Sequence, residues 1–130
     1  MADEVPKRIL VIDDASLIRM YYRAVLERAG FQVEEAFNGL EAIEHLLKAS
    51  FDLLIVDVNM PQMDGVTFLR TLRAKAPPVS ATPALVISTE SEPQRIAAAM
   101  AAGANLYLVK PQSEQALVQY ASLLCGIAHG

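Results

Sequence analysis

The chain has 130 residues and a mass of 14.1 kDa, which is the size of a single domain. Hydrophobic residues make up 53% of it and charged residues 20%, a composition that excludes a disordered protein. The net charge is −4 and there is no dense Lys/Arg stretch, which argues against binding driven by charge to nucleic acid or to an anionic membrane.

Targeting and metal-binding signals are few. The longest apolar run, from Ile96 to Ala104, is far shorter than the roughly 20 residues that span a bilayer. The amino terminus resembles neither a signal peptide nor a transit peptide, so we expect a cytoplasmic protein. Cys125 is the only cysteine, cannot form an internal disulfide, and is expected in or near the core. His45 and His129 are too isolated to build a zinc site, and we expect both to be solvated.

The first half of the chain predicts strands and helices in alternation: a strand over 9–12, a helix that ends at Gly30, a strand over 31–36, a helix over 39–49 and a strand over 53–56. The alternating pattern of residues 31–36 places that strand near a sheet edge. In the first helix Arg19, Arg23 and Glu27 lie opposite a predicted apolar stripe, which consists of Leu17, Ile18, Tyr21, Tyr22, Val25, Leu26 and Ala29. The predicted apolar stripe of the second helix consists of Ile43, Leu46 and Leu47.

The second half continues the alternation: a helix over 65–75, a strand over 84–87, a helix over 92–102, a strand over 106–109 and a last helix capped by Ser113. The loop over 76–83 contains three prolines and is expected only to bridge a helix and a strand. The helix over 65–75 is expected to bury Phe68, Leu69 and Leu72. The last helix is expected to bury Leu117, Ala121, Leu124 and Ala128.

Five repeats of strand and helix predict an α/β fold with a parallel sheet, because near-continuous apolar strands are typical of a sheet covered on both faces. Crossovers between parallel strands are right-handed almost without exception. We therefore expect a flavodoxin-like, doubly wound (βα)5 fold with strand order 2-1-3-4-5. A single domain over 1–130, with a core over about 7–126, accounts for the whole chain.

Polar side chains follow four of the predicted strands, at the edge of a doubly wound sheet where ligands bind. Asp14 alone is equally well explained as a helix N-cap, and Ser88 and Thr89 as caps of the following helix. The complete set is Asp13, Asp14, Asp57, Ser88, Thr89 and Lys110.

Taken together these groups need a counter-charge, because two unit charges about 4 Å apart repel by about 4 kcal/mol at an effective dielectric constant of 20. Lys110 supplies one positive charge, and a divalent cation with oxygen ligands would supply the rest. Few protein ligands and open positions suit Mg²⁺ (or Mn²⁺) better than Ca²⁺, which takes a fuller set of ligands.

Four blocks of sequence closely resemble the CheY-like receiver domain of two-component response regulators, in family order and at family spacing over about residues 7–126. A stand-alone, single-domain member is the expectation. The blocks are Ile12-Asp13-Asp14-Ala15-Ser16; Val56-Asp57-Val58-Asn59-Met60-Pro61 with Met63-Asp64-Gly65; Ile87-Ser88; and Gly103-Ala104 leading to Lys110-Pro111.

The resemblance implies that the Asp57 carboxylate accepts a phosphoryl group from a phosphohistidine of a sensor histidine kinase or histidine phosphotransfer protein. It further implies that Asp14, Asp57 and the backbone carbonyl of Asn59 bind Mg²⁺ directly, with Asp13 binding it directly or through water. Lys110 is similar to the lysine that pairs with the phosphoryl group.

The resemblance also implies a conformational switch. Ser88 is similar to the hydroxyl that binds the phosphoryl group, and Tyr107 to the aromatic switch residue, although spacing alone indicates only a half-exposed strand tyrosine. Pro111 is similar to a proline that follows a cis peptide bond. Thr89 stands where the family often has a smaller residue, so it is expected to narrow access to the acceptor.

Two further residues stand at family positions that tune the lifetime of the phosphorylated state, namely Asn59 and Glu90. From them we expect dephosphorylation to be self-catalysed and the phosphorylated state to be short-lived. The chain is otherwise expected not to be an enzyme.

Other functions are less consistent with the residues. Haloacid dehalogenase-type enzymes need a second Asp where this chain has Asn59, and a flavodoxin needs a phosphate loop where it has Asp13 and Asp14. A dinucleotide-binding loop is absent at that place. A non-phosphorylated pseudo-receiver is the alternative of another class, and the presence of the acids and of Lys110 argues against it.

The output is expected to run through protein contact, because the chain ends at Gly130, too soon after the last helix for an output domain. A monomer in chemotaxis-type signalling is the favoured interpretation, and a phosphorelay intermediate or a phosphate sink is the alternative. The sequence does not separate them.

Overall fold

Strands and helices alternate along residues 5–126, the part of the chain that the structure, a computed structural model, describes. The strands are β1 (Arg8–Ile12), β2 (Gln32–Ala36), β3 (Leu53–Val56), β4 (Ala84–Ser88) and β5 (Leu106–Val109). The helices are α1 (Ser16–Arg28), α2 (Gly39–Lys48), α3 (Gly65–Arg73), α4 (Pro93–Ala102) and α5 (Glu114–Leu124), with a short 3-10 helix, η1 (Val79–Ala81). The predicted boundaries agree with these to within about two residues at most ends.

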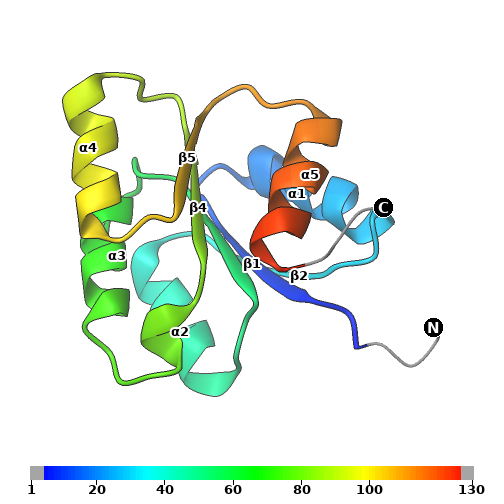
Figure 1. The fold of residues 1–130 in the computed structure, drawn as a ribbon, viewed down its shortest axis with the longest axis horizontal. Helices are drawn as coiled ribbons and strands as arrows, with labels where there is room; N and C mark the ends of the chain where they lie inside the picture. Colours follow the sequence, from blue (N-terminus) through cyan, green and yellow to red (C-terminus); the bar gives the residue numbers. More distant parts are fainter. Residues whose placement is uncertain (1–4, 127–130) are drawn as a thin grey trace.

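The five strands form one parallel sheet in the order β2-β1-β3-β4-β5, as predicted. Helices α1 and α5 cover one face of this sheet, and α2, α3 and α4 cover the other (Figure 1). In the register, Ile12 lies beside both Ala36 and Val56, and Ser88 lies beside Val109. The carboxyl ends of the strands therefore meet at one edge of the sheet, where the loops after β1, β3, β4 and β5 lie together.

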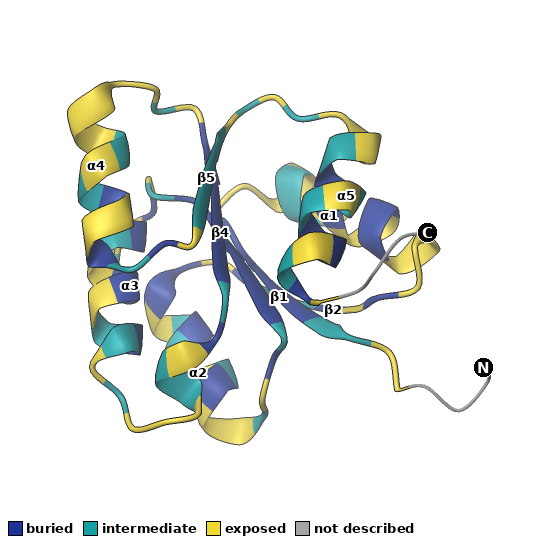
Figure 2. Ribbon diagram, viewed as in Figure 1, coloured by how far each residue is buried: buried dark blue, intermediate teal, exposed yellow. Residues whose placement is uncertain are grey.

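The core has two layers, one on each face of the sheet. Alternate residues of β1 point into them: Leu10 and Ile12 pack with α2, α3 and α4, whereas Ile9 and Val11 pack with α1 and α5. The strands at the centre of the sheet are buried on both faces and the outer faces of the helices are exposed (Figure 2). Burial of such side chains stabilises a fold by roughly 1.5–3 kcal/mol each, so the central strands hold the loops that follow them in place.

The apolar stripes of α1 and α2 are narrower than predicted. The residues of α1 that the structure buries are Tyr22, Val25 and Leu26, because only this arc of the helix faces the sheet and α5. Predicted stripe residues that are instead exposed are Leu17, Tyr21 and Ala29 of the first helix segment and Leu47 of α2.

The prediction for the carboxyl-terminal elements is partly corrected. The residues of β5 are half-buried or exposed, because β5 is an edge strand, as the predicted strand order places it. Leu117 and Ala121 of α5 are buried, and Leu124 is only half-buried. Ala128 and His129 lie outside the described residues.

The guanidinium of Arg73 joins several segments by hydrogen bonds at the opposite edge of the sheet, where β4 and β5 begin. It donates hydrogen bonds to the backbone carbonyls of Gly103, Ser80 and Thr82 and to the side-chain oxygen of Asn105. Burial lowers the pKa of Arg73 from its ordinary value. The proline-containing loop before β4 is therefore more than a bridge, because it is fixed to both α3 and the turn that ends α4.

Two smaller predictions have different outcomes. Cys125 is buried, as expected. The prediction that His45 is solvated is wrong, because its ring is half-buried, with Nδ1 3.1 Å from Oε1 of Glu34, and lies in an edge-to-face arrangement with the ring of Phe51. Within residues 5–126, every helix is too short or too polar to cross a bilayer.

Candidate functional site

The loop after β1 places Asp13 and Asp14 in different environments. Asp13 is buried: its backbone N–H donates to the carbonyl of Ala36, and its Oδ1 accepts from the N–H of Ala15 at 2.9 Å. The side chain of Asp14 is exposed. Because Ala15 is the N-cap residue of α1 and no side chain caps this end, the N-cap explanation for Asp14 is wrong. No side chain of residues 5–126 is hydrogen-bonded to its carboxylate, which leaves it available to bind a ligand.

Asp57 follows β3 directly and is buried beside the end of β1, where its N–H donates to the carbonyl of Ile12 at 2.9 Å. The start of α3 packs very closely against it. A Cβ atom on Gly65 would lie 2.6 Å from the Asp57 carbonyl oxygen and 2.7 Å from Cα of Val58. The glycine that begins α3 thus allows the helix to approach the backbone of Asp57.

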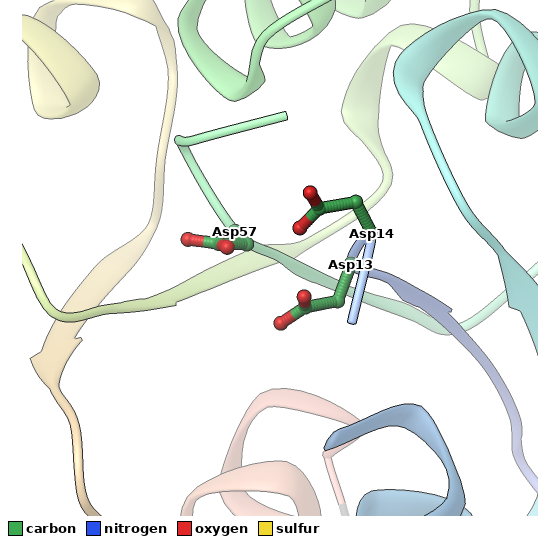
Figure 3. A group of neighbouring side chains, drawn as sticks. All are labelled: Asp13, Asp14 and Asp57. Carbon is green, nitrogen blue, oxygen red and sulfur yellow. The ribbon is translucent and has the colours of Figure 1, made fainter. Parts of the chain in front are cut away.

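The carboxylates of Asp13, Asp14 and Asp57 form one cluster, with one oxygen of each lying within 4.8 Å of the others (Figure 3). At that separation each pair of unit charges repels by roughly 3–4 kcal/mol at an effective dielectric constant of 20. The donors are all carboxylate oxygens, the type that Mg²⁺ and Mn²⁺ prefer. The donor set therefore fits a divalent cation.

Lys110 supplies positive charge to the same cluster. Its Nζ donates to Oδ2 of Asp13 at 3.0 Å and lies 3.8 Å from Oδ2 of Asp57, and its side chain is 15% exposed. The backbone N–H of Lys110 donates to the carbonyl of Ser88 at 2.8 Å, which holds the lysine at the end of β5 beside β4. The peptide bond between Lys110 and Pro111 is cis. Three carboxylates and one ammonium leave a net charge of −2 at this edge of the sheet.

Burial is the main influence on the Asp57 carboxyl and raises its pKa above the ordinary value. The nearby Lys110 ammonium lowers the pKa, and the Asp13 carboxylate raises it again. Desolvation and a like charge thus disfavour the charged form of Asp57, while the lysine favours it. A cation bound at the cluster would add to the influence of Lys110.

The loop after β4 carries the predicted switch residues. Ser88 is fully buried, and its Oγ accepts a hydrogen bond from the N–H of Glu90 at 3.2 Å, while Thr89 between them is exposed. Tyr107 of β5 is half-buried, and its hydroxyl donates to the Glu90 carbonyl at 2.7 Å. The cap explanation for Ser88 and Thr89 is wrong, since Glu92 is the N-cap residue of α4 and this end has no side-chain cap.

Asn59 and Glu90 connect the loops after β3 and β4. The exposed Asn59 amide donates from Nδ2 to Oε2 of Glu90 at 3.4 Å, and Glu90 Oε1 lies 3.9 Å from the guanidinium of Arg95. The Asn59 N–H also donates to Oδ1 of Asp57 at 3.4 Å. Both predicted lifetime-tuning residues therefore lie at the rim of the carboxylate cluster.

Sequence reasoning missed two supports of the site. Arg19, placed on the outer face of the first helix, donates instead to the carbonyl of Asp13. The buried Asn38 caps α2 by accepting from the N–H of Glu41, and it donates to Oε1 of Gln62 at 3.1 Å. Gln62 lies in the turn between β3 and α3 and has a φ of 69°, in the left-handed region. Its hydrogen bond with Asn38 ties this turn to the start of α2. The asparagine directly before α2 was the local signal for a cap at that place.

Comparisons with known proteins agree with this geometry. The family model for the response regulator receiver domain matches residues 9–122. The chemotaxis protein CheY-3 of Vibrio cholerae is 38% identical over 105 residues, which are 80% of each chain. The transcriptional regulatory protein ResD of Bacillus subtilis is 38% identical over 85% of this chain, and the match spans 45% of its own length. A solved structure of chemotaxis protein CheY4 of Vibrio cholerae has a TM-score of 0.85 at 35% identity, covering 92% of this chain and 99% of that chain.

Proposed function

Because the chain belongs to the response regulator receiver domain family, we propose that it accepts a phosphoryl group on Asp57 and signals through its phosphorylated state. The observation that carries this proposal is the position of the Asp57 carboxylate, which shares one cluster with Asp13 and Asp14 and lies 3.8 Å from the Lys110 ammonium. Phosphoryl transfer to this residue requires a carboxylate nucleophile, ligands for a divalent cation and a nearby positive charge, and the cluster contains all three kinds of group.

In the proposed reaction a carboxylate oxygen of Asp57 attacks the phosphorus of a phosphohistidine. The new oxygen–phosphorus bond forms an acyl phosphate, and the phosphorus–nitrogen bond breaks with its electron pair left on the imidazole. Lys110 stabilises the negative charge of the phosphoryl oxygens from its side of the cluster. Hydrolysis by water then returns the carboxylate and releases phosphate.

Asp14, Asp57 and the backbone carbonyl of Asn59 are the proposed direct ligands of Mg²⁺ (or Mn²⁺), and Asp13 contributes directly or through water. When bound, the cation supplies positive charge to the phosphoryl oxygens. Asp13 is already hydrogen-bonded through both oxygens, to Ala15 and to Lys110, so its main part is to hold the lysine.

The proposed switch acts through the loop after β4. The phosphoryl group recruits the Ser88 hydroxyl, which now accepts from Glu90, and Tyr107 follows because its hydroxyl is bonded to the Glu90 carbonyl. Receiver signalling then alters the face formed by α4, β5 and α5. Thr89 is exposed beside this path and limits access of donors, and Asn59 and Glu90 shorten the lifetime of the phosphorylated state.

We further propose that residues 1–130 form a single receiver domain of a cytoplasmic, monomeric regulator that is not otherwise an enzyme. Its partners are a sensor histidine kinase or a histidine phosphotransfer protein, and a downstream protein. A chemotaxis-type role is favoured by the similarity to chemotaxis proteins over most of both chains. A phosphorelay intermediate or phosphate sink is the second candidate. The similarity is not confined to chemotaxis proteins, since the chain also matches 45% of a transcriptional regulatory protein and 32% of a protein-glutamate methylesterase.

The test is phosphorylation of the purified chain in Mg²⁺ by a phosphorylated histidine phosphotransfer protein, followed by intact mass. We expect one added phosphoryl group that hydroxylamine removes, as an acyl phosphate requires, and none on Asp57→Asn or in EDTA. Phosphorylation of Asp57→Asn to the wild-type level would contradict the proposal. A pull-down with and without beryllofluoride then separates the roles: retention of a phosphotransfer protein favours the relay and retention of a motor protein favours chemotaxis.

A further inference from the structure

We propose that Arg19 is a positioning residue for the cation site and acts on Asp14 through the peptide carbonyl of Asp13. The inference rests on the proposed function, because it assumes that the carboxylate cluster binds Mg²⁺. It assigns a part in the site to a residue of α1 whose hydrogen bonds go to a backbone carbonyl and to Glu35, and not to the carboxylates of Asp13, Asp14 or Asp57.

The side chain of Arg19 lies between the loop after β1 and the edge strand β2. Its Nη1 donates to the carbonyl oxygen of Asp13 at 2.6 Å, and its Nε donates to Oε1 of Glu35 at 2.9 Å. The side chain is only 16% exposed, so water competes weakly for these bonds. Because a guanidinium is planar and rigid, one anchored edge fixes the direction of the other. Glu35 therefore holds Arg19 in place, and Arg19 holds the Asp13 carbonyl.

The carbonyl of Asp13 belongs to the peptide group that joins Asp13 to Asp14. The other polar groups of Asp13 are also bonded, its N–H to Ala36 and its carboxylate to Ala15 and Lys110. The exposed carboxylate of Asp14 takes its position from this backbone. Fixing the peptide group limits the range of positions that the carboxylate samples, which lowers the entropy lost when a cation binds.

The positive charge of Arg19, considered alone, should weaken Mg²⁺ binding, whereas its positioning of Asp14 should strengthen it. A positive charge close to a cation site weakens binding, and here Glu35 offsets it. Removing the arginine should therefore strengthen Mg²⁺ binding if only charge matters, and weaken it if Arg19 positions Asp14. The sign of the change separates the two explanations.

Arg23 provides a matched control. It lies one turn further along α1, carries the same charge, and donates from Nη1 to Oε2 of the same Glu35 at 3.1 Å. Its other partner is Glu27, so it has the charge and the glutamate contact of Arg19 without the bond to Asp13. Arg19→Ala and Arg23→Ala change the net charge equally.

The experiment is calorimetric titration of the full chain with MgCl₂, with folding of each variant checked by circular dichroism. We expect Arg19→Ala to bind Mg²⁺ about tenfold more weakly than the wild type, at the lower end of the effect of removing a partner that orients a ligand. Arg23→Ala should bind as tightly as the wild type or more tightly. Arg19→Lys, which keeps the charge but cannot bridge both acceptors with a planar group, should also bind more weakly, by about threefold.

Unchanged or tighter binding by a folded Arg19→Ala would overturn the inference, as would an equal loss in Arg23→Ala. If Arg19→Ala does not fold, Arg19→Lys decides: weaker binding supports the inference and wild-type affinity overturns it. A wild-type chain that binds Mg²⁺ while the arginine variants match it refutes the inference alone. A wild-type chain that does not bind Mg²⁺ refutes the metal site of the proposed function and the inference with it.

Discussion

The hydroxyl of Tyr107 donates a hydrogen bond of 2.7 Å to the backbone carbonyl of Glu90, and this bond connects β5 to the loop after β4. The N–H of the same Glu90 donates to the buried Ser88 hydroxyl. Both backbone groups of Glu90, a half-buried loop residue, are therefore held by residues of β4 and β5. These two hydrogen bonds fix the position of the loop after β4.

Replacing Tyr107 by Phe tests this connection. The ring and its packing remain, and the loss of one hydrogen bond should lower the free energy of unfolding by only about 0.5–1.5 kcal/mol. The loop after β4 should lose protection, so we expect faster amide hydrogen exchange over residues 88–92, measured by mass spectrometry. Tyr120→Phe on α5 is the control, and equal loosening of the loop in that variant would contradict the assignment.

Replacing Gly65 by Ala should destabilise the protein even though alanine favours helices. Helix propensity alone predicts a gain of up to about 1 kcal/mol, whereas the added Cβ would lie 2.6 Å from the backbone oxygen of Asp57. Overpacking against backbone typically costs about 1–3 kcal/mol, so a net loss is expected in urea denaturation. Gly39→Ala should also cost stability, because its Cβ would lie 2.8 Å from Cγ and 2.9 Å from the backbone oxygen of Met63. A gain in stability for Gly65→Ala would show that α3 can move away.

Replacing Asp14 by Asn should have opposite effects with and without Mg²⁺. In EDTA the variant should melt at a higher temperature than the wild type, because one of three mutually repelling carboxylates is neutralised. Added Mg²⁺ should raise the melting temperature of the wild type, since a ligand of the folded state stabilises it, and should raise that of the variant much less. Glu44→Gln, an exposed acid on α2, controls for net charge. A variant that gains as much from Mg²⁺ as the wild type would remove Asp14 from the ligands.

The buried thiol of Cys125 predicts a pH dependence of stability. Burial raises its pKa in the folded protein to about 11, above the value of the unfolded chain. The neutral thiol is favoured by folding, so this contribution is fully present below about pH 9 and is lost as the pH rises toward 11. The stability of the wild type relative to Cys125→Ala should therefore shrink by roughly 2 kcal/mol between about pH 8 and about pH 10.5, as measured by urea denaturation. A constant difference would show that the thiol reaches solvent.

Much of the fold and of the site could be predicted from local sequence. The apolar runs that became β1 and β3 are each followed directly by aspartate, and the run that became β5 is followed directly by Lys110, so these charged side chains mark the edge of the sheet. A parallel order then brings Asp13, Asp57 and Lys110 together without any further information. Their distances and burial required the structure.

The supports of the site could not be predicted in this way. The contacts from Arg19 to Glu35 and from Asn38 to Gln62 join residues 16 and 24 positions apart, and each depends on how a helix or turn sits on the sheet edge. Periodicity assigned Arg19 to the outer face because it counts polarity and not reach: a long side chain on the flank of α1 can extend to β2. The exposure of Leu17 and Leu47 has the same origin, since a stripe does not say how much of it a neighbour covers.

The contacts of Arg73 give α4 two mechanically unequal ends. At its carboxyl end, the carbonyl of Gly103 accepts from both Nε and Nη2 of Arg73, so this end is clamped to α3. Its amino end has no side-chain cap and continues from the loop that carries Glu90. A displacement of that loop would therefore move the amino end of α4 while its carboxyl end, at Gly103, stays in place. The contacts of Arg73, remote from the charged cluster, thus determine how a local change at the proposed phosphoryl site would alter the outer surface of α4.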